Sequence, residues 1–158
     1  MNGPAPSLEP PESVTEVLLF GIGNSGRRDD GLGWAFLDRV QGETPFAGRV
    51  EYRYQLQVED AALVNRAEHV VFVDACEGDL PEGFRWQPCE PSRDFEFTTH
   101  ALPPGAVLHL CRELYGKTPE ANVLTIRGSC WDLQTGLSPQ AERCLDQALR
   151  FFREQVLA

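Results

Sequence analysis

The chain has 158 residues, 42% of them apolar, which is enough for one hydrophobic core and short for two domains. Its formal net charge of -10 argues against nucleic acid or an anionic membrane as a partner, because both would repel the protein. A basic protein surface or a cationic metal site is electrostatically more compatible.

Residues 1–13 contain neither the cationic start nor the apolar run of a signal peptide. We expect a flexible lead-in there, followed by one domain over residues 14–158. No apolar stretch approaches the roughly 20 residues that span a bilayer. The cysteines are odd in number, widely spaced and without a C-x-x-C pair, which favours reduced, buried thiols in a cytoplasmic protein: Cys76, Cys89, Cys111, Cys130 and Cys144.

Short apolar strands alternate with amphipathic helices along the rest of the chain. The first strand is predicted at 14–20, where VTEVLLF precedes Gly-x-Gly, and the first helix at 31–40, where apolar side chains recur on one face. The later elements are predicted as strand 50–56, helix 59–67, strand 69–73, edge strand 84–87, helix 105–115, strand 122–126 and helix 138–156. This order predicts an α/β fold: a single three-layer α/β/α domain with a mostly parallel, twisted central sheet.

The last two helices allow more detailed expectations. Helix 105–115 is expected to bury Leu114 together with Val107, Leu108 and Cys111. In the final helix, Ser138 is expected to cap the first turn and Pro139 to occupy the first helical position.

Two acidic features are expected at the carboxyl ends of strands, where open α/β sheets form their binding crevices. One is the turn GIGNSGRRDDGLG over residues 21–33, which contains Asp29 and Asp30, and the other is Asp74 after VVFV. If the two strands are neighbours, both features face one crevice. A helix cap or dipole partner is the alternative for Asp29 and for Asp74. The glycines around Asp30 favour a site there, because they permit left-handed backbone or close approach of another chain.

His100 is the histidine whose position most favours function, since it lies in the irregular segment FEFTTHALPPG and loops often hold functional groups. A structural role remains open for it, and is expected for His69 and His109. Asp30, Asp74 and His100 would supply two carboxylates and one imidazole. That ligand set suits a borderline divalent ion such as nickel, zinc or iron(II).

A dinucleotide-binding module is the competing interpretation of the opening turn. The segment from Gly21 to Gly26 is a literal G-x-G-x-x-G after a strand. Asp29 and Asp30 follow at once, however, and would repel a pyrophosphate. No acid ends the second strand at the spacing of roughly 20 residues that this fingerprint requires. The sequence also lacks a G-x-S-x-G nucleophile elbow.

The same residues resemble the hydrogenase maturation endopeptidases. The segment GIGNSGRRDDGLGWAFLDRV resembles the amino-terminal signature of that family, and HVVFVDA resembles its second signature strand. TTHALPPGAVLHL resembles the segment that bears the family's histidine, and the likeness extends over about residues 14 to 155. The turn differs from the commoner version, since Ser25-Gly26-Arg27-Arg28 is more basic and less rich in leucine.

The resemblance implies an endopeptidase that removes the carboxyl-terminal extension of a nickel-loaded hydrogenase large-subunit precursor. It implies that Asp30, Asp74 and His100 contact nickel carried by the precursor rather than held by the free enzyme. Asp30 stands where some members have Glu, and Arg27 or Arg28 is a candidate contact to the precursor. Three other classes remain open: a nucleotide-binding module, a non-catalytic assembly chaperone, and a metallohydrolase that holds its own metal.

Overall fold

Five strands form one sheet in the order β2-β1-β3-β5-β4. The computed structural model describes residues 15–43, 45–93 and 102–157. Four strands run parallel, and β4 lies antiparallel at one edge. Their bounds are β1 Thr15–Ile22, β2 Arg49–Arg53, β3 Ala67–Cys76, β4 Phe84–Pro88 and β5 Glu120–Arg127. The predicted α/β fold with a mostly parallel sheet is confirmed.

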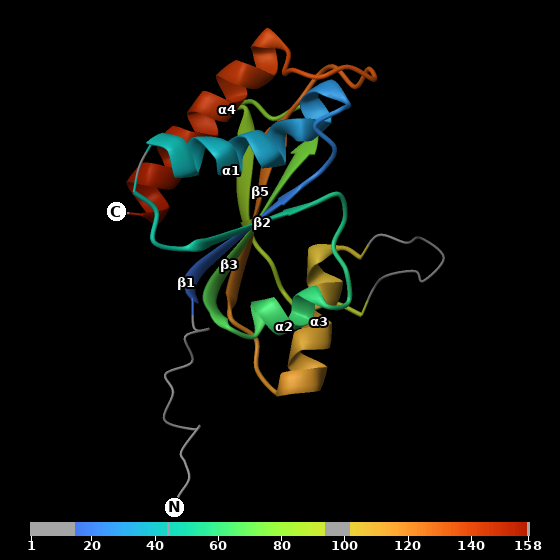
Figure 1. Cartoon of the computed structure of the whole chain (residues 1–158), viewed down its shortest axis with the longest axis vertical. Coiled ribbons are helices and arrows are strands. Elements are labelled where there is room, and N and C mark those ends of the chain that lie inside the picture. Colours follow the sequence, from blue (N-terminus) through green and yellow to red (C-terminus); the bar gives the residue numbers. More distant parts are fainter. Residues whose placement is uncertain (1–14, 44, 94–101, 158) are drawn as a thin grey trace, which may run out of the picture.

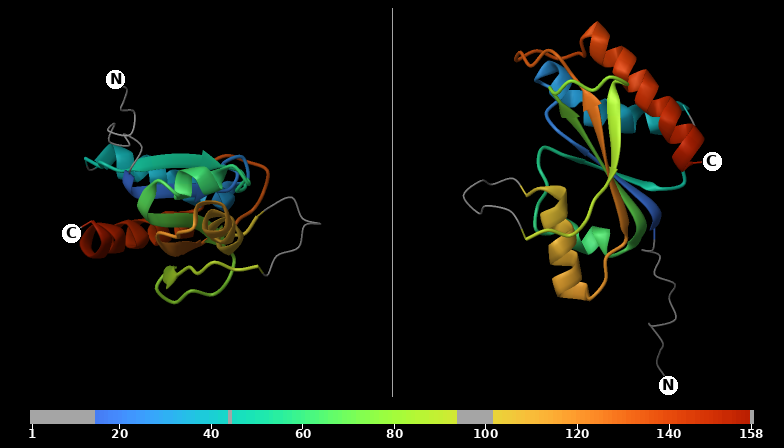
Figure 2. Two further views of the ribbon diagram at one scale, coloured as in Figure 1. Left: turned by 90° about the horizontal axis from the view of Figure 1, so that it is seen from below. Right: turned by 180° about the vertical axis from the view of Figure 1, so that it is seen from behind.

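The helices cover both faces of this sheet (Figures 1 and 2). On one face lie α1 (Leu32–Glu43) and α4 (Pro139–Phe151), the latter continued by the π-helical turn η3 (Phe152–Val156). On the other lie α2 (Asp60–Val64) and α3 (Pro104–Tyr115). The chain enters α1 through a short 3-10 helix, η2 (Arg28–Gly31).

Successive side chains along the central strands point to opposite faces of the sheet, and this divides the core into two layers. Leu19 of β1 and Val71 of β3 pack beneath α1 and α4, whereas their neighbours Leu18 and Val70 pack beneath α2 and α3. All four side chains are buried. A strand that is buried on both faces must be apolar at successive positions, which explains the continuous apolar runs in β1 and β3.

Ser138 is confirmed as the cap of α4, because its hydroxyl accepts a hydrogen bond from the Ala141 N–H at 3.2 Å and Pro139 begins the helix. Three other details are wrong. The strand predicted at 50–56 is shorter, since β2 ends at Arg53. Helix 59–67 is shorter than predicted, since α2 ends at Val64 and β3 begins at Ala67. Leu114 is 61% exposed, because the last turn of α3 extends past the sheet before the chain turns at Gly116 (Figure 1).

No helix within the described ranges has the length and apolar character needed to cross a membrane. Residues 1–14, which include the predicted lead-in, lie outside the part of the chain that the structure describes.

Gly33 allows α1 to lie directly on the ends of β1 and β3. A Cβ atom at this position would lie 2.5 Å from the Val73 carbonyl oxygen and 2.8 Å from that of Ile22. We expect Gly33→Ala to lower the free energy of unfolding by about 2–3 kcal/mol, because neither backbone oxygen can move freely.

Gly42 provides a control in the same helix, because a Cβ there would meet nothing within 4 Å. Gly42→Ala should raise the free energy of unfolding by about 0.5–1 kcal/mol through better helix propensity. Urea unfolding of both variants measures the two effects. Equal changes in the same direction would exclude close backbone packing as the reason for Gly33.

Candidate functional site

The two acidic features predicted from the sequence meet at the carboxyl edge of the sheet. β1 and β3 are hydrogen-bonded neighbours, with Gly21 opposite Val73. Asp30 follows β1 in η2, and Asp74 lies in β3, which continues two residues beyond it to Cys76. Both acids line one open pocket of about 460 Å³, whose other lining residues are Ile22, Gly23, Tyr54, Gln55, Leu56, Leu102, Pro103 and Pro104.

Asp30 is half-buried and is held by the glycine turn before it. The Asn24 N–H donates to its Oδ2 at 2.9 Å. A Cβ atom on Gly23, which has a φ of 140°, would lie 2.0 Å from the Asp30 carbonyl oxygen, so the turn requires glycine here. Burial raises the pKa of the Asp30 carboxyl more than the Asn24 hydrogen bond and the charge of Arg27 lower it.

Asp74 has the more strongly perturbed carboxyl of the two. Burial raises its pKa from 3.8 to about 6, the negative charge of Asp30 adds to the rise, and a hydrogen bond from the Ala75 N–H at 2.8 Å opposes it. A half-buried carboxylate next to a second one is unfavourable without a cation. A divalent ion in this pocket would remove the repulsion and favour the ionised form of both side chains.

Asp29, the neighbour of Asp30, has a different role. Its side chain is fully buried, and its carboxylate accepts hydrogen bonds from the N–H groups of Ser129, Cys130 and Ser138 and from the Ser138 hydroxyl, at 2.7, 2.9, 2.8 and 2.7 Å. Burial raises the pKa of Asp29, but the four hydrogen bonds together lower it by more than burial raises it. The pKa therefore lies below its ordinary value. Asp29 therefore ties η2 to the segment between β5 and α4.

This anchoring role goes beyond the cap or dipole partner that the sequence suggested for Asp29. Its partners lie about 100 residues further along the chain, so no local pattern could reveal them. The nearest signal was Ser138, which was predicted as a helix cap and also donates to this carboxylate.

His100, the third predicted site residue, lies outside the described residues, as do all of residues 94–101. Leu102 and the two prolines after it line the pocket that contains Asp30 and Asp74, which we call the acid pocket. The described chain therefore reaches the acid pocket two positions after His100. Within the described ranges, no group of three or more His, Cys, Asp and Glu side chains could hold a metal ion. The three-ligand site remains a prediction.

The other two histidines are placed as part of the fold. His69 lies within β3 rather than before the strand, and its Nε2 is 2.7 Å from Oδ1 of Asn122. His109 lies in α3, as predicted. The cysteines are free, but only Cys111 and Cys144 are buried, so burial was wrongly predicted for the three that are half-buried: Cys76, Cys89 and Cys130.

The backbone N–H donors of the glycine turn form hydrogen bonds with other groups of the protein. The N–H of Gly23 donates to the Arg53 carbonyl oxygen, that of Asn24 to Asp30, and that of Gly26 to the Asn24 side chain. A dinucleotide site needs such donors free for a pyrophosphate. The turn instead pairs one of these donors with the Asp30 carboxylate, whose charge would repel a phosphate, and this disfavours the nucleotide-binding alternative.

Several solved structures of hydrogenase maturation endopeptidases share this fold. The hydrogenase maturating endopeptidase HybD from E. coli superposes with a TM-score of 0.70 at 17% identity, over 89% of this chain and 94% of that one. The [NiFe] hydrogenase maturation protease HybD from Thermococcus kodakarensis superposes with a TM-score of 0.63 at 23% identity, over 88% and 97%. The chain has the fold of the hydrogenase maturation endopeptidases.

A third structure of this kind, the endopeptidase HycI from Escherichia coli, gives a TM-score of 0.63 at 19% identity, over 85% of this chain and 87% of that one. Coverage of nearly the whole of each chain means that the likeness concerns the complete domain rather than a shared βαβ unit. No protein-family model and no curated protein sequence matches the chain.

Proposed function

We propose that this protein is an endopeptidase that removes the carboxyl-terminal extension of a nickel-loaded hydrogenase large-subunit precursor. The observation that supports it most directly is the pair of carboxylates, Asp30 and Asp74, in one open pocket at the carboxyl edge of the sheet. The fold shared with hydrogenase maturation endopeptidases supports the same activity. A maturation step of this kind would take place in the cytoplasm.

Nickel is in this proposal part of the substrate. Asp30 and Asp74 would offer it two carboxylate oxygens, and His100 an imidazole nitrogen. Bound nickel would polarise a carbonyl group or lower the pKa of an attacking water molecule. Asp74, with a pKa of about 6 in the absence of a cation, is mostly ionised at pH 7, and a bound ion would further favour the ionised form.

Selectivity for loaded precursor follows from the same arrangement. Without an ion between them, the two carboxylates repel each other and give the precursor no favourable contact. The charge of the precursor's nickel turns this repulsion into attraction. The enzyme would therefore discriminate between loaded and empty precursor at the step that binds the cleavage site.

The decisive experiment compares nickel-loaded and nickel-free precursor by mass spectrometry after incubation with this protein. We expect cleavage of the loaded precursor only, and at least a hundredfold slower cleavage by Asp74→Asn and by His100→Ala, because each removes a ligand that contacts the ion (roughly 3 kcal/mol in transition-state binding). Circular dichroism should show that both variants remain folded.

The possible outcomes separate the competing classes. Efficient cleavage of nickel-free precursor would contradict nickel recognition. Binding of the precursor without shortening it would favour an assembly chaperone, and purification of the protein with stoichiometric metal would favour a self-contained metallohydrolase. Unchanged cleavage by both variants would remove Asp74 and His100 from the site.

A further inference from the structure

An exposed aromatic surface lies beside the acid pocket. We call Trp34, Tyr52 and Tyr54 the aromatic face. The Trp34 ring centroid lies 5.3 Å from that of Tyr54 and 5.5 Å from that of Tyr52. Tyr54 is 69% exposed, and the half-buried rings of Trp34 and Tyr52 beside it extend the apolar surface that it presents.

The aromatic face and the acid pocket are continuous. The face lines an open groove together with Arg53, Gln55 and Gln57. Tyr54 and Gln55 line this groove and the acid pocket alike. A polypeptide segment that leaves Asp30 and Asp74 along this side therefore passes over Tyr54.

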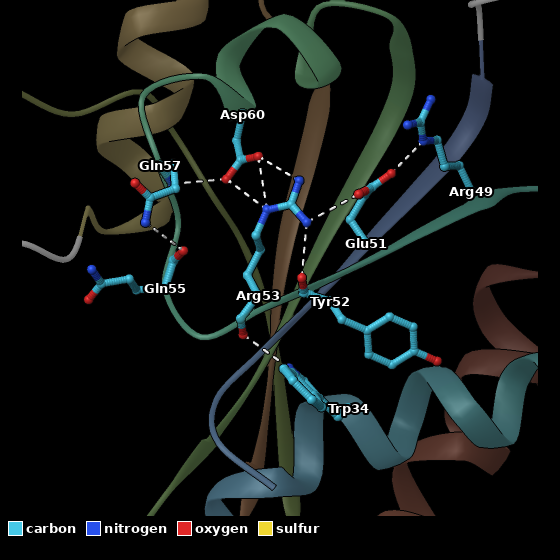
Figure 3. A network of polar contacts seen from close by, with 8 residues as sticks. All are labelled: Trp34, Arg49, Glu51, Tyr52, Arg53, Gln55, Gln57 and Asp60. Carbon is cyan, nitrogen blue, oxygen red and sulfur yellow. Dashed lines mark hydrogen bonds and ion pairs between the residues drawn. The ribbon is translucent and has the colours of Figure 1, made fainter.

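Hydrogen bonds hold the face in place before any partner arrives. The Trp34 indole Nε1–H donates to the Arg53 carbonyl oxygen at 3.0 Å (Figure 3). The Tyr52 hydroxyl donates to Asp38 at 2.6 Å. Because Trp34 and Tyr52 are held in this way and Tyr54 packs on Trp34, less conformational entropy is lost when a partner binds to the rings.

The charges around the face favour a cationic partner. Figure 3 shows that the guanidinium of Arg53 contacts Asp60, at 2.9 Å, and Glu51, at 3.1 Å, and that Glu51 also contacts Arg49. These two arginines and two carboxylates neutralise one another. Asp38, which accepts the hydrogen bond from Tyr52, and the acid pair in the adjoining pocket add three negative charges, against which Arg27 acts only on Asp30.

We propose that the aromatic face binds a basic segment of the substrate protein, with a lysine or arginine side chain lying over the exposed ring of Tyr54. The negative face of an aromatic ring attracts a cation, and arginine also stacks on it. The proposal rests on the proposed function for the identity of the partner. The preference for a basic over an apolar side chain follows from the charges of this chain alone.

A binding experiment tests the face without nickel and without cleavage. Two capped pentapeptides, acetyl-Gly-Ser-Arg-Ser-Gly-amide and the same peptide with norleucine in place of arginine, are titrated into the ¹⁵N-labelled protein. We expect the arginine peptide to shift the Trp34 indole N–H signal in a saturable manner. The norleucine peptide should bind several-fold more weakly, because it lacks the charge.

Variants of Tyr54 distinguish the contribution of the aromatic ring to peptide binding from the contribution of apolar surface alone. Tyr54→Phe keeps the ring and should bind the arginine peptide as the unmodified protein does. Tyr54→Leu keeps an apolar side chain and should bind it about two- to fivefold more weakly. With nickel-loaded precursor, Tyr54→Leu should raise KM and leave kcat unchanged. An exposed side chain is a safe place to substitute, so loss of folding is not expected.

Three results would overturn the proposal: equal binding of the two peptides, equal binding to Tyr54→Phe and Tyr54→Leu, or shifts confined to the groove on the opposite edge of the sheet near Phe84 and Phe151. Failure of the proposed function has a different signature. If the peptide binds at Tyr54 but no precursor is cleaved, the proposal of a basic partner is retained and the proposed endopeptidase activity is rejected.

Discussion

Replacing Asp29 by alanine is expected to lower the free energy of unfolding by about 3–5 kcal/mol, because it leaves four hydrogen-bond donors around a fully buried side chain, two of them from the buried Ser138, without their acceptor. Three of those donors are backbone N–H groups of Ser129, Cys130 and Ser138. The loss is a large share of the roughly 5–15 kcal/mol that stabilises a typical domain. Equilibrium unfolding in urea measures it.

Asp30→Ala is the matched control, since it changes the same residue type one position along the chain. Asp30 is only half-buried and accepts a hydrogen bond from Asn24, so we expect its loss to change stability by less than about 1 kcal/mol. For cleavage of nickel-loaded precursor we expect the larger effect from Asp30→Ala, which should be inactive even under conditions where it is fully folded. Similar destabilisation by both variants would contradict the division between an anchoring and a ligand carboxylate.

The stabilising effect of Asp29 has a defined pH dependence. Its pKa in the folded protein lies below the ordinary value, so the unfolded chain takes up a proton more readily. The contribution is therefore complete above the unfolded pKa of about 4 and is lost as the pH falls through the lower folded pKa. The difference in stability between the unmodified protein and Asp29→Ala should shrink in acid.

Replacing Asp74 by asparagine is expected to stabilise the protein by up to about 3 kcal/mol at pH 7 while it removes the proposed activity. Asp74 has a pKa of about 6 in the fold against an ordinary value of 3.8. Asparagine has no charge to bury and can still accept the hydrogen bond that the Ala75 N–H donates. A site that holds an unfavourable carboxylate ready for a cation lowers the stability of the fold.

The direction in which stability changes with pH follows from the raised pKa of Asp74. Between about pH 4 and pH 6 the folded protein holds a proton that the unfolded chain has released, so the stability of the unmodified protein falls as the pH rises through this range. Below about pH 4 both states are protonated at this position and the penalty is absent. The advantage of Asp74→Asn should therefore be small at pH 4 and reach its full value above pH 6.

Two controls isolate the cause. Asp132→Asn removes a carboxylate from an exposed position and should change stability by less than about 0.5 kcal/mol at either pH. In an Asp30→Asn background the gain from Asp74→Asn should be smaller, because Asp30 contributes to the raised pKa of Asp74. A gain at pH 7 that is unchanged in that background would exclude repulsion between the two carboxylates.

Only the part of the site that follows from the order and pairing of the strands could be predicted from the sequence. Asp30 follows β1, Asp74 follows the apolar run of β3, and parallel neighbouring strands end at the same edge, so their meeting in one pocket follows once β1 and β3 are paired. The aromatic face was not predicted. Trp34 lies in α1 and Tyr54 follows β2, and neither segment shows locally that the two rings pack together.

The order of strands and helices, the two-sided burial of β1 and β3 and the cap of α4 are properties of the sequence itself. Element type and capping arise from interactions between residues a few positions apart, and burial on both faces of a strand leaves an unbroken apolar run in the chain. The sequence also favoured Asp30 over Asp29 as the site carboxylate, through the surrounding glycines and the family resemblance. The anchoring role of Asp29 was decided only by the tertiary structure, because only partners about 100 residues away determine that this side chain is buried among N–H donors while Asp30 lines the pocket.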